Sequence, residues 1–167
     1  MKSLFTAAAV FIMALVLWGC PYKSTVGIDD EATIKIDPAL TGTWHRSDYP
    51  EDSTELVFKK LSGKKYTLTA KITDGQGGYQ SSTNEAWFSK AGKWTLMSFY
   101  DPQAKEYFFG EVELKGGKLT IKFLSEDITA EQFTSTAAMS KFIASLYAEN
   151  RVLYDDDIEL NDLEKMK

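Results

Sequence analysis

Cysteine and histidine are almost absent from this chain. Its 167 residues include one cysteine, Cys20, and one histidine, His45. A single cysteine cannot form a disulfide within the chain, so the stability of the fold must come from packing. One histidine is too few for a zinc site made of several histidines, and no Gly-x-Ser-x-Gly motif accompanies it. We therefore expect no catalytic residues, no metal and no cofactor, and we predict that the protein is not an enzyme.

Positive charge is also scarce. The chain has 19 basic and 24 acidic residues, which gives a formal net charge of -5 at pH 7. Its basic residues form no cluster longer than pairs such as Lys59-Lys60 and Lys64-Lys65. Binding to nucleic acid requires a basic face that displaces the counterions of the phosphates. We therefore expect no nucleic-acid partner.

The longest apolar run lies at the N-terminus. It follows Lys2 and covers residues 4–18 without a charge or a proline, and Gly19-Cys20 comes next. A helix that spans a membrane needs about 20 apolar residues, and this run is shorter. The pattern of a basic start, an apolar stretch and a small residue is typical of a secretory signal peptide. We expect residues 1–19 to be this signal peptide.

Leu17-Trp18-Gly19-Cys20 resembles the lipobox of bacterial lipoproteins. The resemblance implies cleavage before Cys20, a diacylglyceryl thioether on its sulfur and a further acyl chain, such as palmitate, on its new amino group. Two or three acyl chains anchor a protein firmly, whereas one binds marginally. Pro21 rather than Asp follows Cys20, and the family's sorting rule then implies the outer membrane, without saying which side the domain faces. The alternative is an ordinary secretory signal followed by a free thiol.

Residues 20–38 are predicted to be the lipidated cysteine and a tether. The stretch after Cys20 is polar and rich in turn-forming residues, and Asp29-Asp30-Glu31 adds like charges that favour an extended chain. An alternative for these acids is a surface-export signal, because they resemble those of some Bacteroidetes lipoproteins. Residues 33–37 alternate in polarity and could form a short strand before Pro38 ends it.

Residues 39–155 are predicted to form one domain, built mainly from strands. Apolar and polar residues alternate over 65–72 and 118–123, which is the period of a half-buried strand. Short turn-forming segments separate the runs. A meander of this kind avoids exposed edges by closing, or nearly closing, into a barrel. The predicted strands cover residues 42–46, 54–60, 65–72, 85–89, 94–100, 107–115 and 118–123.

One amphipathic helix is predicted over about 135–149. Its apolar stripe consists of Met139, Phe142, Ile143, Leu146 and Tyr147, spaced as on one helix face. Thr134 or Ser135 can cap its start, and Asn150 its end. We expect the helix to pack on the barrel or to plug one of its mouths. Residues 151–154 could pair as a last strand, and residues 156–167 are expected to be a frayed acidic tail.

Gly42-Thr43-Trp44, at the start of the first strand, resembles the Gly-x-Trp motif of lipocalins and of lipocalin-like bacterial lipoproteins. The resemblance implies an antiparallel lipocalin-like barrel over about 40–155, with Gly42 and Trp44 at the barrel closure. In that family an arginine covers the tryptophan. Here no arginine stands at the end of the seventh predicted strand, and Arg151 follows the predicted helix.

Aromatic residues are crowded into three successive predicted strands, two of which have large apolar groups on both faces. One face must fill the barrel, and the other needs a cover. The helix and the tether could supply that cover. Alternatively, the aromatics could form the wall of a pocket or groove for a hydrophobic or sugar-like ligand. The candidate ligand-binding residues are Trp87, Trp94, Tyr100, Tyr107 and Phe109.

Two functions remain open at this point. In the first, a membrane-anchored lipoprotein of the bacterial envelope binds a small hydrophobic ligand inside the barrel. In the alternative, the barrel is filled, and the lipoprotein is an accessory that meets an envelope protein through its surface. A sizeable interior cavity would favour the first function, and a filled interior would favour the second.

Overall fold

The computed structural model describes residues 21–46, 54–73, 79–155 and 160–166. The predicted signal peptide and Cys20 lie outside these residues, so cleavage and lipidation stay predictions. In the part of the chain that is described, no helix combines the length and the apolar character needed to cross a membrane.

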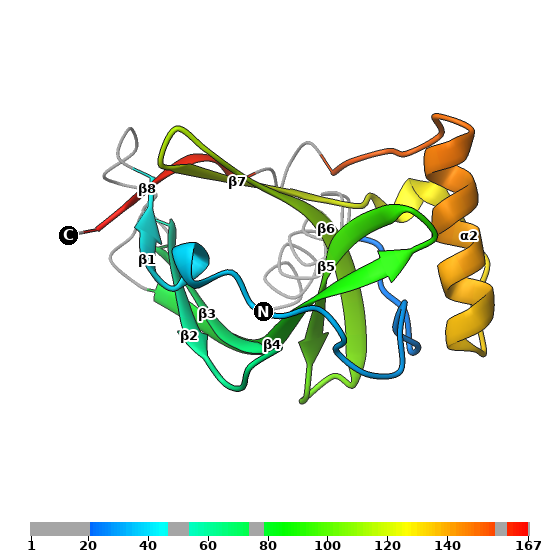
Figure 1. The fold of residues 1–167 in the computed structure, drawn as a ribbon, viewed down its shortest axis with the longest axis horizontal. Helices are drawn as coiled ribbons and strands as arrows, with labels where there is room; N and C mark the ends of the chain where they lie inside the picture. Colours follow the sequence, from blue (N-terminus) through cyan, green and yellow to red (C-terminus); the bar gives the residue numbers. More distant parts are fainter. Residues whose placement is uncertain (1–20, 47–53, 74–78, 156–159, 167) are drawn as a thin grey trace, which may run out of the picture.

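Eight antiparallel strands close into a barrel in which each strand pairs with the next and β8 returns to β1 (Figure 1). This confirms the prediction of a mainly β, closed, lipocalin-like barrel with one helix near the C-terminus. Closure leaves the sheet without free edge strands. The strands are β1 Gly42–His45, β2 Thr54–Lys60, β3 Tyr66–Thr73, β4 Tyr79–Ala91, β5 Trp94–Asp101, β6 Glu106–Lys115, β7 Lys118–Phe123 and β8 Leu160–Lys165.

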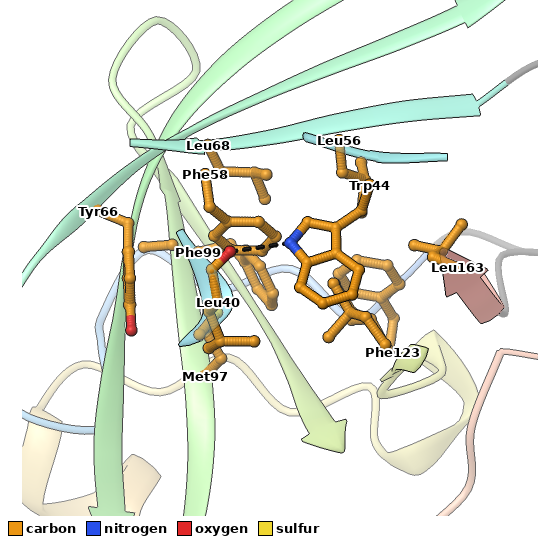
Figure 2. Close-up of a cluster of buried hydrophobic side chains, with 13 residues drawn as sticks. Leu40, Trp44, Leu56, Phe58, Tyr66, Leu68, Met97, Phe99, Phe123 and Leu163 are labelled. Atoms are coloured by element: carbon orange, nitrogen blue, oxygen red, sulfur yellow. Dashed lines mark hydrogen bonds between the residues drawn. The ribbon is translucent and has the colours of Figure 1, made fainter. Parts of the chain in front are cut away.

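One cluster of apolar side chains occupies the barrel interior. Trp44, Phe99 and Phe123 belong to it, and none of them is more than 7% exposed. Figure 2 shows these side chains close together, with Leu56 and Leu163 at the edge of the group. The ring of Phe99 lies 5.2 Å from that of Phe123, measured between centroids. Each fully buried side chain of this size contributes roughly 1.5–3 kcal/mol to folding, so this cluster contributes strongly to stability.

Helix α2, Thr136–Ala148, begins and ends as the sequence predicts. The Ser135 side chain accepts a hydrogen bond from the Ala138 N–H at 3.3 Å. At the other end, Asn150 has a φ of 51°, and the Arg151 N–H donates to the Leu146 carbonyl at 2.9 Å. These contacts satisfy backbone groups that a helix end would otherwise leave unpaired.

The helix packs against the outside of the barrel. Met139, Ile143 and Leu146 form a second buried cluster with Leu96 of β5 and Phe109 of β6. In Figure 1, α2 stands beside the barrel wall at the end of the β4–β5 hairpin. We predicted that the helix either packs on the barrel or plugs one of its mouths. The structure shows the first.

The strand that closes the barrel comes from the segment predicted to be a frayed tail. Residues 151–154 form no strand, and Tyr154 makes an isolated bridge to Leu124. Instead β8 pairs with both β7 and β1. Leu160 and Leu163 both pack in the interior cluster although their spacing of three does not fit a regular strand. Asp162, with a φ of 54°, lies at a bulge between them, and an extra residue there turns both leucines inward.

The predicted tether is wrong for the described residues after Cys20. Residues 21–32, which we call the N-terminal strap, lie on the barrel, and Tyr22 and Ile28 are 3% and 2% exposed. Ser24 exchanges backbone hydrogen bonds of 2.9 and 2.7 Å with Tyr107 of β6. The strap thereby pairs with the part of β6 that extends beyond the end of β7. Unpaired strand edges and buried apolar side chains both favour this docking.

The strap leads into a short 3-10 helix, η1 Pro38–Leu40, and residues 33–37 form no strand. Leu40 packs in the interior cluster and is 2% exposed. The Tyr66 hydroxyl donates to the Asp37 carbonyl at 2.9 Å and accepts from the Asp37 N–H at 2.6 Å. These bonds fix η1 against the barrel just before β1 begins.

Candidate functional site

The Gly-x-Trp residues lie where the first and last strands meet. Trp44 is 1% exposed, and its indole N–H donates to the Leu40 carbonyl at 2.8 Å (Figure 2). Lys165 of β8 stands opposite Trp44 in the ladder, and its Nζ is 5.3 Å from the indole ring centroid. The same ammonium donates to the Ala39 carbonyl at 2.9 Å. Lys165 therefore links β8, β1 and η1.

Gly42 makes room for this contact. Its φ is 138°, and a Cβ at this position would lie 2.6 Å from Cε of Lys165. The sequence does not predict this contact, because the family resemblance points to an arginine and Lys165 lies in the segment predicted to be a frayed tail. The covering cation comes from β8 rather than from the end of the seventh strand.

All five candidate ligand-binding aromatics lie on the outer face of β4, β5 and β6. Four of them form one group around Tyr107. Its ring centroid lies 6.0 Å from that of Trp87, 4.8 Å from that of Tyr100 and 6.5 Å from that of Phe109. Trp94 lies apart from this group and packs on Tyr147 of α2, at 5.6 Å between centroids. Ligand binding by these residues stays a prediction, but their place is the outer wall and not the barrel lumen.

The strap and α2 cover much of this aromatic face. Trp87 is 3% exposed and Phe109 is fully buried, whereas Trp94, Tyr100 and Tyr107 are partly exposed. The sequence left open whether this face is covered by the helix and the segment after Cys20 or by a bound ligand. The structure shows the first kind of cover. The apolar groups on the outside of the sheet are thus largely packed within the chain.

Asp29 fixes the strap over the aromatic face. Its Oδ1 accepts hydrogen bonds from the Trp87 indole N–H at 2.9 Å and from the Ser89 hydroxyl at 2.8 Å. The hydroxyls of Ser89 and Ser98 are 2.7 Å apart, and both serines are fully buried. Oδ2 of Asp29 is buried and has no hydrogen-bond partner among the described residues. A carboxylate in such surroundings is costly to bury, and its hydrogen bonds offset part of that cost.

Pockets among the described residues open on the molecular surface. One of about 520 Å³ lies between the start of the strap and the 3-10 helix η2 Glu126–Ile128, and includes Pro21 and Tyr22. A second, of about 410 Å³, is lined by charges of both signs, namely Asp30, Glu31, Lys64 and Lys65. No member of the interior cluster lines either of them.

A third pocket, of about 300 Å³, combines a carboxylate with phenol groups. We call it the Glu111 pocket; its lining residues are Glu111, Tyr147, Asn150, Val152 and Tyr154. They come from β6, the last turn of α2 and the segment after it. The sequence predicts Tyr147 in the apolar stripe of the helix and Tyr154 in a last strand. The pairing of the two tyrosines with Glu111 is set by the tertiary fold, and the sequence carries no signal for it.

The tyrosines of the Glu111 pocket are hard to ionise. Burial raises the pKa of Tyr147 far above its ordinary value of 10.0, and the neighbouring Glu111 carboxylate raises it further. Burial, followed by the Glu111 carboxylate, also raises the pKa of Tyr154 to about 12. Both phenols therefore carry their protons at neutral pH, because desolvation and a nearby negative charge disfavour phenolate.

Comparisons of the chain with protein-family models, with curated proteins and with solved structures found no match. The geometry of the chain is therefore the basis for a functional proposal.

Proposed function

We propose that the chain is a lipoprotein of the bacterial envelope, anchored through Cys20 in the outer membrane, whose barrel is filled and which works through its outer surface. It acts as an accessory or protein-interaction domain rather than as an enzyme. The observation that carries this proposal is the interior cluster, in which Trp44, Phe99 and Phe123 share the lumen. An eight-stranded barrel is just wide enough for side chains to fill it or for one small ligand, and here side chains occupy the centre.

The lipobox resemblance supports the lipid anchor, and the strap determines how close to the bilayer the anchor would hold the domain. Pro21 bridges to Ser125, and the Tyr22 N–H donates to the Leu124 carbonyl at 2.7 Å. The chain is thus held to the barrel from the residue that follows Cys20. A lipid on Cys20 would hold the domain close to the bilayer, since consecutive Cα atoms are about 3.8 Å apart.

The substitution Cys20→Ser tests the anchor. The mature wild-type protein should remain in the membrane fraction after a carbonate wash, because multiple acyl chains bind firmly. The variant should lose this retention, whereas Lys23→Ala, at an exposed strap position, should behave as wild type. Firm membrane retention of the Cys20→Ser variant would contradict the proposal.

A small hydrophobic ligand in the barrel is the second candidate function, since the closed eight-stranded barrel is of the size that carries one. An environment-sensitive apolar dye distinguishes the two functions. The filled barrel predicts no saturable increase in dye fluorescence, and a carrier predicts saturation at one dye per chain that a bound lipid displaces.

A further inference from the structure

The Glu111 pocket has a composition that the structural role of its residues does not explain. It lies on the outer wall of the barrel, between β6 and the C-terminal end of α2. Glu111, Tyr147, Val152 and Tyr154 are each partly exposed and Asn150 is exposed, so solvent reaches the pocket. Tyr147, Val152 and Tyr154 pack against the buried cluster under the helix, but attaching the helix does not explain the carboxylate of Glu111 beside them.

Polar oxygens converge in this pocket. The carboxylate of Glu111 lies beside the hydroxyls of Tyr147 and Tyr154, and Asn150 adds a side-chain amide at the rim. The Tyr147 hydroxyl is buried beside Glu111 and Tyr154 and interacts with both, although neither contact is a hydrogen bond of full geometry. The Glu111 carboxylate is partly exposed and can accept further hydrogen bonds. A ligand with its own donors would supply them.

The charges around the pocket favour a neutral ligand. Lys122 of β7 stands opposite Glu111 in the ladder, and its Nζ is 5.8 Å from the ring centroid of Tyr154. The two opposite charges offset each other, so neither a cation nor an anion is strongly favoured in the pocket. A purely apolar ligand would strip water from the carboxylate and the phenols without replacing their hydrogen bonds. The ligand that fits is therefore neutral and rich in hydrogen-bonding groups.

The walls of the pocket add a preference for a ring with an apolar face. Val152 and the rings of Tyr147 and Tyr154 supply apolar surface, and Trp94 packs on the Tyr147 ring. A pyranose ring has apolar C–H faces, and its hydroxyls both donate and accept hydrogen bonds. We propose that the Glu111 pocket binds a neutral sugar residue, with the Glu111 carboxylate accepting from its hydroxyls and its C–H face on a tyrosine ring. This proposal goes beyond the envelope function and does not depend on the lipid anchor.

The test is a ligand titration by saturation-transfer NMR. The full mature chain, in a detergent without sugar groups, is titrated with glucose, galactose, mannose and N-acetylglucosamine, and with tetramethylammonium as a cationic probe. At least one sugar should saturate, with a dissociation constant on the order of 1 mM. Saturation by its methyl glycoside as well would show that a sugar within a glycan chain is also accepted.

Matched variants locate the binding. Glu111→Gln should weaken it roughly tenfold, because a neutral amide oxygen accepts a weaker hydrogen bond than a carboxylate does. Glu113→Gln, at an exposed position two residues along β6, should bind as wild type. If Tyr147→Phe proves unfolded by circular dichroism, Asn150→Ala at the exposed rim takes its place; either change should weaken binding about threefold or more.

Three results would overturn the sugar proposal. The first is that none of the four sugars saturates. The second is that Glu111→Gln binds the sugar as tightly as wild type. The third is that tetramethylammonium binds more tightly than every sugar, which would assign the pocket to a cation.

Discussion

Lys165 lies over the ring of Trp44, with its Nζ 5.3 Å from the ring centroid and 2.9 Å from the Ala39 carbonyl oxygen. The two residues stand opposite each other at the junction of β8 and β1. One lysine therefore connects the last strand, the first strand and the 3-10 helix before it. The barrel is closed by a short strand from the end of the chain, and this contact ties that strand in place.

Replacing Lys165 should loosen the closure. Lys165→Ala removes the cation over Trp44 and the hydrogen bond to Ala39, and should lower the free energy of unfolding by about 1–2 kcal/mol. Lys165→Arg keeps a cation and should stay within about 0.5 kcal/mol of wild type. Lys115→Ala, at an exposed position of β6, is the control. Urea unfolding measures all three, and equal stabilities of the alanine variants would contradict this role for Lys165.

Because side chains fill the barrel interior, truncating a large one should strongly lower the free energy of unfolding. Phe99→Ala removes a fully buried ring and should lower the free energy of unfolding by about 3–5 kcal/mol, because the surrounding side chains cannot close the cavity. Leu61→Ala, at a side chain that is 51% exposed, should change it by less than about 0.5 kcal/mol. A loss below about 1 kcal/mol for Phe99→Ala would mean that the interior is loosely packed.

The strap should open when the Asp29 side chain, which is hydrogen-bonded to Trp87 and Ser89, is removed. Asp29→Ala leaves the Trp87 indole N–H without its partner and should cost about 1–3 kcal/mol. Trypsin should then cleave after Lys23 faster than in wild type, and the tryptophan emission should shift to longer wavelength. Glu31→Ala, at an exposed strap position, should leave both readouts unchanged. Unchanged cleavage in the Asp29→Ala variant would show that apolar contacts alone hold the strap.

The raised pKa values of Tyr147 and Tyr154 predict a loss of stability in alkali. In the unfolded chain a tyrosine ionises near pH 10, whereas the pKa of Tyr154 in the fold is about 12 and that of Tyr147 is raised more strongly. The fold favours the protonated phenols, so their contribution is present below about pH 10 and is lost as the pH rises from about 10 to 12. Denaturant midpoints at pH 9 and pH 11 measure the loss.

The double variant Tyr147→Phe, Tyr154→Phe is the control for this titration. Its stability should fall less between the two pH values than that of wild type, because other groups that ionise in this range are present in both proteins. An equal fall in both proteins would assign the alkaline effect to groups outside the Glu111 pocket.

The barrel could be predicted from the sequence where apolar residues follow the strand period. β7 alternates strictly, with Leu119, Ile121 and Phe123 buried, and the sequence predicted its bounds correctly. β8 could not be found in this way. Its leucines are three residues apart, and a bulge at Asp162 turns them to one side. A bulge breaks the alternation on which strand prediction depends.

The strap and the Glu111 pocket are two features that could not be predicted from the sequence. The charges of Asp29, Asp30 and Glu31 indicate a solvated linker, but Asp29 is hydrogen-bonded to Trp87 in a fold that the local sequence does not specify. The Glu111 pocket joins residues from β6, α2 and the segment after it. Such long-range pairings depend on the completed barrel and leave no local pattern.

The most direct test of the central claim is an intact mass spectrum of the protein, purified from its native membrane and recorded under gentle conditions. The account predicts a chain that begins at Cys20, carries a diacylglyceryl group and a further acyl chain, and retains no apolar ligand. A chain with unmodified Cys20, or one that carries an apolar molecule in stoichiometric amount, would contradict it.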